Sequence, residues 1–226
     1  EGIFLSPFKD MLGAPGFLVE VLIGGLAAGL MYSLVALGFV LIFKASGVFN
    51  FAQGVMVLFA ALTLVGLMER GVPVVLGLLL TMVVMIALAF AIERVVLRPL
   101  VNQEYIILFM ATIGLSFFLE GFGELLWGSN VKKLDVGIPD TSFMVRGVQV
   151  NKLEITAALT AAVLVTILAV FFQKTRIGRA LRAVADDHEA ALSIGIPLKT
   201  IWVVVWSVAG LVALVAGIMW GAKSGV

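Results

Sequence analysis

Long apolar runs recur along the chain, and they constrain its fold more than any other feature. Each run approaches the ~20 residues that an α-helix needs to cross the hydrocarbon core of a bilayer. Of the 226 residues, 62% are hydrophobic and 13% are charged, which lies outside the usual range of soluble globular domains. The sequence therefore predicts an all-α fold, a polytopic transmembrane helix bundle of about six spans in a single domain, 1–226. The expected spans are 17–43, 51–68, 74–97, 105–127, 153–173 and 201–221.

The two ends of the chain indicate a trimmed or partial protein. The chain opens at Glu1 rather than at a methionine, and it stops at Val226 just after the last apolar run. We therefore expect a domain that is incomplete at its C-terminus. The first 16 residues are too mixed in polarity for a signal peptide, and we expect them to form an interfacial lead-in.

The composition leaves little chemistry to expect within the chain. A net charge of +1 argues against a nucleic-acid partner, and no cysteine with one histidine argues against a metal site. No Gly-x-x-x-x-Gly-Lys-Ser/Thr phosphate loop occurs, so the chain is not expected to bind ATP by that motif. We expect that the chain is not an enzyme and that it has no cofactor and no catalytic residue.

Ionisable residues next to the apolar runs are expected near the headgroups, at the ends of spans. They are Glu20, Glu93, Arg94 and Glu154. Proton-coupled transporters usually carry an ionisable group within the membrane. The only candidate here is Glu120, so any transport energy is expected to come from another subunit.

Residues 44–50 are all that separates the first two spans, and the second span is short. A short, glycine-interrupted pair of this kind is typical of discontinuous helices in transporters, whose unwound backbone lies beside a cavity. A tight turn at the membrane surface explains the same pattern equally well. Both interpretations stay open at this point.

The fourth span carries polar residues at four-residue spacing, which places them along one side of a helix. They are Thr112, Ser116, Glu120 and Glu124. One interpretation is the lining of a polar path. The other is hydrogen bonding between helices, with the two glutamates reaching to the outer surface.

Small residues at the same spacing predict close helix packing in two other spans. They are Gly25, Gly29 and Ser33 in the first span, and Ala209, Ala213, Gly217 and Gly221 in the sixth. Between the fourth and fifth spans, the loop 128–152 is polar enough to stand in water. Its residues 144–150 alternate around a glycine, which predicts a small hairpin.

The segment 176–196, RIGRALRAVADDHEAALSIGI, is strongly charged although it lies between two apolar runs. On a helical wheel its apolar residues share one arc and most of its charged residues share the other, and Gly195 with Pro197 ends the helix. Asp186 and Asp187 fit poorly to an anionic membrane surface. Docking to another protein is therefore favoured.

The arginines give a direction for insertion. If the loop 174–200 is cytoplasmic, alternation makes the loop 128–152 external. Arg94 and Arg98 then lie inside together with the arginines of the charged segment, whereas Arg70 and Arg146 lie outside. The positive-inside rule favours this orientation.

Three motifs resemble the permeases of ABC importers. Glu189-Ala190-Ala191 followed by Gly195 is similar to their "EAA" cytoplasmic loop, and the wider phrase 178–196 resembles branched-chain amino acid permeases of the LivH/LivM type. The stretch 50–54, NFAQG, is similar to a segment between their first two spans, and 111–116, ATIGLS, to part of their fourth. The similarities extend from about residue 20 to 221. The chain lacks the Ile/Leu-Pro end of the general loop pattern and the further spans with which members of the family continue.

The resemblance implies a permease subunit of a binding-protein-dependent importer in the bacterial inner (plasma) membrane. The implied partners are a second homologous permease subunit, identical or not, two cytoplasmic ABC ATPase subunits that bind the ATP, and an external solute-binding protein. The implied solute is a branched-chain amino acid or a related urea, amide or organic acid. The alternatives from other classes are an ATP-independent secondary transporter or channel for a small neutral solute, and a membrane scaffold.

The resemblance also implies two sets of functional residues. The loop helix would dock on the ATPase and transmit its closure, through Gly178, Arg179, Arg182, Glu189, Ala190, Ala191 and Gly195. At the break, Asn50 and Gln53 would offer neutral polar groups to a zwitterion without trapping it. The implied translocation path is Asn50, Phe51, Gln53, Gly54, Thr112, Ser116 and Glu120.

Overall fold

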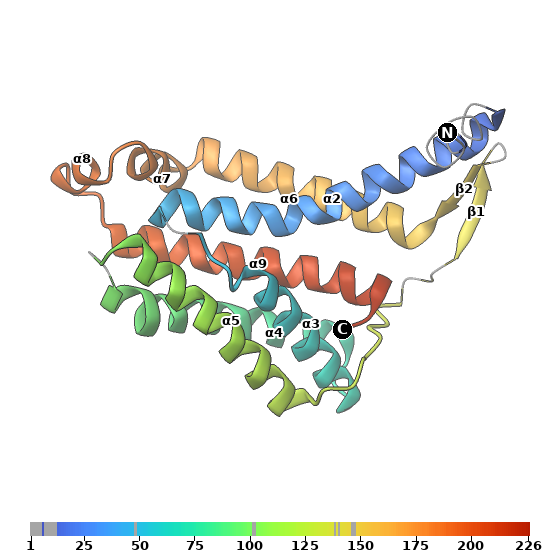
Figure 1. The fold of residues 1–226 in the computed structure, drawn as a ribbon, viewed down its shortest axis with the longest axis horizontal. Coiled ribbons are helices and arrows are strands. Elements are labelled where there is room, and N and C mark those ends of the chain that lie inside the picture. Colours follow the sequence, from blue (N-terminus) through green and yellow to red (C-terminus); the bar gives the residue numbers. More distant parts are fainter. Residues whose placement is uncertain are drawn as a thin grey trace.

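The chain folds into a bundle of helices with one small hairpin (Figure 1). The computed structural model describes residues 6, 13–47, 49–100, 103–137, 139, 141–145 and 148–226. The helices are α2 (Pro15–Ser46), α3 (Gln53–Glu69), α4 (Val74–Ala91), α5 (Tyr105–Trp127), α6 (Lys152–Lys174), α7 (Arg176–Asp186), α8 (His188–Ser193) and α9 (Leu198–Ser224). The predicted all-α, polytopic fold is confirmed.

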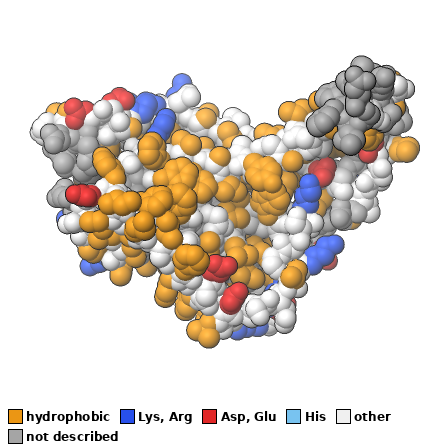
Figure 2. Space-filling model, in the orientation of Figure 1, with side chains coloured by type: hydrophobic (Ala, Val, Ile, Leu, Met, Phe, Trp, Pro, Cys, Tyr) orange, Lys and Arg blue, Asp and Glu red, His pale blue; other side chains and the backbone are white. Residues whose placement is uncertain are grey.

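Among the described residues, 5 helical segments are long and apolar enough to cross a membrane, and α3 is a shorter apolar helix of 17 residues. Hydrophobic side chains cover much of the bundle surface in Figure 2, as a lipid-facing surface requires. The prediction of about six spans therefore agrees with five long helices plus α3.

Helix α9 is the centre of the bundle (Figure 1). Of its most apolar stretch 61% is buried, against 17–33% for the other membrane-spanning candidates. The helices α2 and α6 lie on one side of α9, and α3, α4 and α5 lie on the other. The polar α7–α8 segment and the loop with the hairpin lie at opposite ends of the bundle.

The close packing predicted for the small residues of α9 is confirmed. Ala209 and Ala213 are fully buried, and a Cβ added at Gly217 would lie only 2.6 Å from the carbonyl oxygen of Val57 in α3. Small residues allow this approach because helices in lipid gain most from close van der Waals packing. The close packing predicted for the small residues of the first span is not found within this chain, because Gly25 and Gly29 are exposed with open space around them.

The end of α4 departs from the predicted simple helix. Residues Ile92–Leu97 form a π-helical turn, and Arg98–Leu100 a 3₁₀ turn. Glu93 is 1% exposed and accepts three hydrogen bonds of 2.9 to 3.1 Å from Arg98. Glu93 lies toward the end of the span Val74–Leu100, so its predicted position at a span end is retained, but its burial was not expected. The wider π turn brings residues five apart onto one side of the helix, so that Arg98 neutralises the buried carboxylate.

The hairpin predicted for 144–150 is confirmed. Strands β1 (Ser142–Val145) and β2 (Val148–Asn151) pair antiparallel, and their turn lies outside the described residues. Asn151 then caps α6, since its Oδ1 accepts from the backbone N–H of Leu153 at 2.8 Å and of Glu154 at 3.3 Å.

The charged segment was predicted as one helix over 176–196, and that prediction is wrong. Helix α7 ends at Asp186, and Asp187 is extended, with φ −153°. The Oδ1 of Asp187 accepts from the backbone N–H of Ala190 at 2.9 Å and so starts α8. The predicted stop is confirmed, because Gly195 adopts a left-handed φ of 81° and Pro197 precedes α9.

Candidate translocation site

Helix α3 begins inside the bundle. Near the end of α2, the indole Nε1 of Trp202 donates to the carbonyl oxygen of Ala45 at 3.1 Å. At the start of α3, the Nε2 of Gln53 donates to the carbonyl oxygen of Ala209 at 3.3 Å. Ala209 lies seven residues beyond Trp202 on α9, a distance of about 10 Å along the helix. The segment between α2 and α3 therefore runs about that far along α9 before α3 begins.

The two amide side chains at the break are buried, which decides between the two interpretations of residues 44–50. Asn50 and Gln53 both have 0% exposure. A tight turn at the membrane surface leaves such amides in water, so that interpretation is wrong for this structure. The chain carries an unwound segment between two helices within the bundle, and its buried backbone needs partners.

Local hydrogen bonds supply those partners. Gly47 ends α2 in a left-handed conformation, with φ 70°, and its N–H donates to the carbonyl oxygen of Phe43 at 2.8 Å. The Oδ1 of Asn50 accepts from the backbone N–H of Ala52 at 3.1 Å. Asn50 therefore stabilises the start of α3 much as a helix cap does.

Thr112 of α5 is brought to this break, as the sequence predicted. Its hydroxyl accepts from the backbone N–H of Phe51 at 3.3 Å. The hydroxyl can donate its single proton to one of two carbonyl oxygens, that of Phe49 at 3.3 Å or that of Phe109 at 2.9 Å. Thr112 thus links α5 to the unwound backbone.

Gln53 lies where α2, α3 and α9 meet. A Cβ added at Gly38 of α2 would collide with the Gln53 amide, so this glycine provides the space for it. The Oε1 of Gln53 is buried and has no partner among the described residues. An unsatisfied buried acceptor costs ~1–3 kcal/mol, so its retention favours a functional role over packing.

The first turn of α3 also has free donors. No acceptor lies within hydrogen-bond reach of the N–H groups of Gly54 and Val55 among the described residues. Such groups, with the positive end of the helix dipole, favour an anion. Gly54 is exposed and has no atom near its added Cβ, so this turn is open on one side. Phe51 is 42% exposed on that open side and packs against Phe109, with 4.8 Å between ring centroids.

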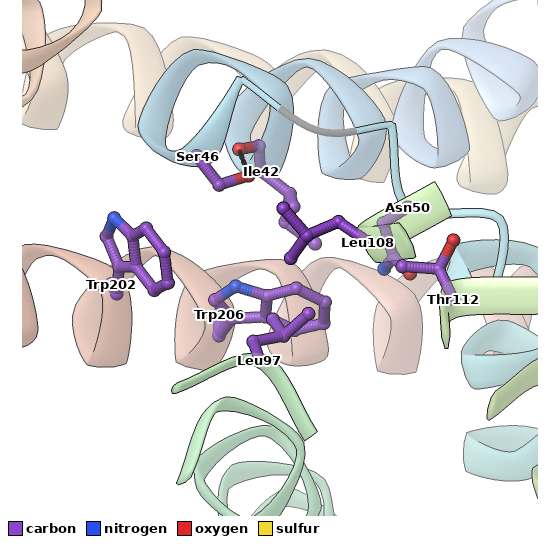
Figure 3. Close-up of a pocket in the computed structure, with 8 residues that line it drawn as sticks. All are labelled: Ile42, Ser46, Asn50, Leu97, Leu108, Thr112, Trp202 and Trp206. Carbon is purple, nitrogen blue, oxygen red and sulfur yellow. Dashed lines mark hydrogen bonds between the residues drawn. The ribbon is translucent and has the colours of Figure 1, made fainter. Parts of the chain in front are cut away.

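A small cavity lies beside the buried side of the break (Figure 3). Its volume is about 10 Å³, which is room for roughly one water molecule and not for an amino acid. The buried Nε1 of Trp206, which borders it, has no partner among the described residues. The buried side of the break is therefore closed to an amino acid in this conformation. The lining residues are Ile42, Ser46, Asn50, Leu97, Leu108, Thr112, Trp202 and Trp206.

The polar stripe of α5 does not stay on the packed side of the helix. Thr112 is buried, Ser116 is half-buried with its Oγ on the carbonyl oxygen of Ile113 at 2.7 Å, and Glu120 and Glu124 are exposed. Each four-residue step rotates the side chain by about 40° because the helix has ~3.6 residues per turn. The structure brings Thr112 to the break and leaves Glu120 on the exterior of the chain.

The predicted coupling residues of α7 hold it against the end of α6. A Cβ added at Gly178 would collide with the backbone of Phe172, so only glycine fits there. Arg179 donates to the carbonyl oxygen of Lys174 at 3.3 Å, and Arg182 donates to that of Phe172 at 3.0 Å. The two arginines thus satisfy free carbonyls at the α6 C-terminus.

The α8 part of the predicted coupling set is less packed. Ala191 is buried, whereas Ala190 and Gly195 are exposed. The side chain of Glu189 lies outside the described residues. The structure therefore gathers the α7 residues into one contact with α6, and no other described residue covers the exposed surface of α7–α8.

The tryptophans of α9 and the Glu93–Arg98 pair were not predicted from the sequence. Trp202 and Trp206 sit one turn apart, a spacing that was available as a signal but that also fits lipid-facing aromatics. The five-residue separation of Glu93 and Arg98 gave none, because it pairs residues only in a π turn.

Comparison with known proteins agrees with the family that the sequence resembles. Residues 21–226 match the family described as branched-chain amino acid transport system / permease component. The high-affinity branched-chain amino acid transport system permease protein LivH of Salmonella typhimurium is 28% identical over 227 residues, which is 93% of this chain and 72% of the relative. LivH of Escherichia coli has the same identity and coverage. BraD of Pseudomonas aeruginosa is 28% identical over 221 residues, with 92% and 72% covered. No solved structure matches.

The chain belongs to this family of permease components, and it is a multi-pass transport subunit of the inner membrane.

Proposed function

We propose that the chain forms the translocation path of a binding-protein-dependent ABC importer for branched-chain amino acids or a related small polar solute. The observation that carries the proposal is the buried break between α2 and α3. There, neutral amides and free helix N–H groups lie within an otherwise apolar bundle. Relatives named as high-affinity branched-chain amino acid permeases support the solute class.

The chemistry of the break suits a zwitterion. A carboxylate is favoured at the N-terminus of α3, where Gly54 and Val55 present free donors to it. An ammonium group can donate to the unsatisfied Oε1 of Gln53. Neither partner carries a full charge, so the solute is held without the strong ion pair that would slow its release.

A second permease subunit would complete the path. Phe51, Gly54 and Glu120 all have an exposed side in this chain. A carboxylate such as that of Glu120 facing hydrocarbon costs ~2.5–3.5 kcal/mol on insertion scales. The exposed side of α5 therefore suits a neighbouring subunit or an aqueous path better than lipid.

Partner ATPases would drive transport through α7 and α8. Asp186 and Asp187 are exposed, so a cytoplasmic protein can contact them. Because Gly178 and Arg182 hold α7 against α6, a push on α7 reaches the spans as a rigid-body movement. The ATP would bind to the partner subunits, and the permease itself would hold no cofactor.

The test is uptake by the complex reconstituted with its ATPases and an external binding protein. With proton and sodium gradients collapsed and ATP on the ATPase side, we expect uptake of labelled leucine to continue, in wild type and in Glu120→Gln. Uptake that stops with the gradient identifies a secondary transporter.

A second arm addresses coupling. Glu189→Lys is expected to abolish substrate-stimulated ATP hydrolysis while membrane insertion persists, and Gly195→Asp should do the same. Full stimulation in Glu189→Lys would remove α8 from the coupling site. A cysteine at position 186 that reacts only from the binding-protein side would reverse the orientation.

A further inference from the structure

A large groove opens at the α7 end of the bundle. It has a volume of about 1200 Å³ and lies between the last turns of α2, the start of α5, and the helices α6 and α7. Its lining is mixed in polarity, with Lys44, Gln103, Arg182 and Asp186 among apolar residues. The groove is wide enough for an amino acid with its hydration water, in contrast to the cavity of about 10 Å³ at the break.

The groove and the cavity share a wall. Ser46, Leu108 and Trp202 line both of them. Asn50 and Thr112 line only the cavity. Leu108 and Trp202 are each 8% exposed, so these two side chains fill the space between the two volumes. Figure 3 shows the side chains of Trp202 and Leu108 projecting into the region between α2 and α9.

We infer that Leu108 and Trp202 are the gate between the α3 break and the groove that α7 borders. This inference rests on the proposed function for the identity of the solute, and on the geometry alone for the position of the barrier. With the gate closed, a solute at Asn50 has no route to the groove. Moving the Trp202 indole aside joins the two volumes.

The closed position of Trp202 is held by α2. Its Nε1 donates at 3.1 Å to the carbonyl oxygen of Ala45, in the last turn of that helix. An α-helix leaves its last carbonyls without an internal partner, so the indole satisfies a group that needs one. Separation of α2 from α9 at this end breaks the bond and frees the side chain.

Helix α7 is placed to cause that separation. Gly178, Leu181 and Val184 of α7 are buried, and all three line the same groove as Trp202. Helix α7 also packs against both α2 and α9. A movement of α7 therefore reaches the two helices that the Trp202–Ala45 bond joins, and the gate opens as a consequence.

Cysteine accessibility tests the gate, because the chain has no cysteine of its own. Single reporters are placed in the cavity, as Ile42→Cys and separately as Thr112→Cys, and in the groove, as Lys44→Cys. The assembled complex without ATP is treated with a membrane-impermeant maleimide from either side. We expect Lys44→Cys to react and both cavity reporters to be protected.

Opening the gate by mutation should expose the cavity from the groove side. Trp202→Ala is expected to raise the labelling rate of each cavity reporter by at least about tenfold, because an open state of ~0.1–10% becomes a major one. Leu108→Ala should do the same without touching the bond to Ala45. The matched control is Trp220→Ala at the other end of α9, where the indole packs on Tyr32, and it should leave both reporters protected.

The inference fails if neither Trp202→Ala nor Leu108→Ala changes labelling, if Trp220→Ala exposes the cavity equally, or if labelling comes only from the side opposite to Lys44→Cys. The readout needs no transport, solute or ATP. A failed gate and a failed importer are therefore separate results.

Discussion

Two of the interruptions between helices, at residues 47–52 and at Asp187, have the same kind of hydrogen bond in opposite surroundings. In each, a short side-chain oxygen accepts from a backbone N–H that begins the next helix: Asn50 for α3 and Asp187 for α8. Asn50 is fully buried and Asp187 is exposed. The buried break carries neutral amides, whereas the exposed one carries charges.

This difference follows from the solvent of each region. A charge inside the bundle meets neither water nor a counter-charge at the break, while a charge on α7–α8 costs little and offers contacts to another protein. The buried break is thereby suited to a polar solute, and the exposed break to a protein partner. The predictions below disturb the exposed break, the buried break and then α5.

A large effect is expected from Gly178→Ala, which disturbs the contact between α7 and the end of α6. The added methyl group collides with the Phe172 backbone, which cannot move as a side chain can. We expect a loss of ~1–3 kcal/mol in stability together with loss of stimulated ATP hydrolysis. Gly25→Ala adds the same methyl group in open space and is the control for both thermal melting and ATPase measurements. Wild-type coupling in Gly178→Ala would show that α7 need not be fixed to α6.

Substituting Asp for Asn50, and separately Asn for Asp187, tests the difference between the buried and the exposed break directly. Asn50→Asp places a carboxylate in the buried break at a cost of ~2.5–3.5 kcal/mol, and we expect uptake and the yield of folded complex to fall sharply. Asp187→Asn should change stability by less than ~0.5 kcal/mol, because Asp and Asn cap about equally well. Equal effects of the two substitutions, measured by melting of the purified complex, would remove the distinction between the regions.

A smaller effect is expected on α5. Ser116→Leu removes a half-buried hydroxyl that bonds only to its own helix among the described residues, and we expect a partial decrease in uptake with normal assembly. Glu120→Gln should change uptake by no more than about twofold, as for other exposed positions. Both are measured as initial rates of leucine uptake. A loss of uptake in Glu120→Gln comparable to that of Asn50→Asp would move the site from the break to α5.

Much of the fold could be predicted from apolar run length, because a helix that crosses a bilayer has a nearly fixed number of residues. The break was predictable as well, since Gly47 and a short following run leave few other structures. Its position within the bundle was not, because a surface turn has the same sequence pattern.

Other features of the fold could not be predicted from the sequence. Spacing along one helix shows which residues share a side, but it does not show which side faces a neighbour. Gly25 and Gly29 have the spacing of closely packed small residues and face outward, and Glu120 shares a stripe with Thr112 yet is exposed. The burial of Glu93 depended on a local π turn, and the end of α7 depended on Asp187 bonding to the backbone rather than continuing the helix.

The most direct test of the account is Gln53→Leu. The buried Oε1 of Gln53 has no partner among the described residues, so a leucine of similar size should leave the thermal stability of the complex unchanged or raise it. Because that oxygen is proposed to meet the solute, binding-protein-dependent leucine uptake should fall by about tenfold or more, the effect of losing ~1.4 kcal/mol of binding. Stability retained with uptake lost is the predicted result. Stability lost with uptake per folded complex unchanged would assign Gln53 to packing and place the path elsewhere.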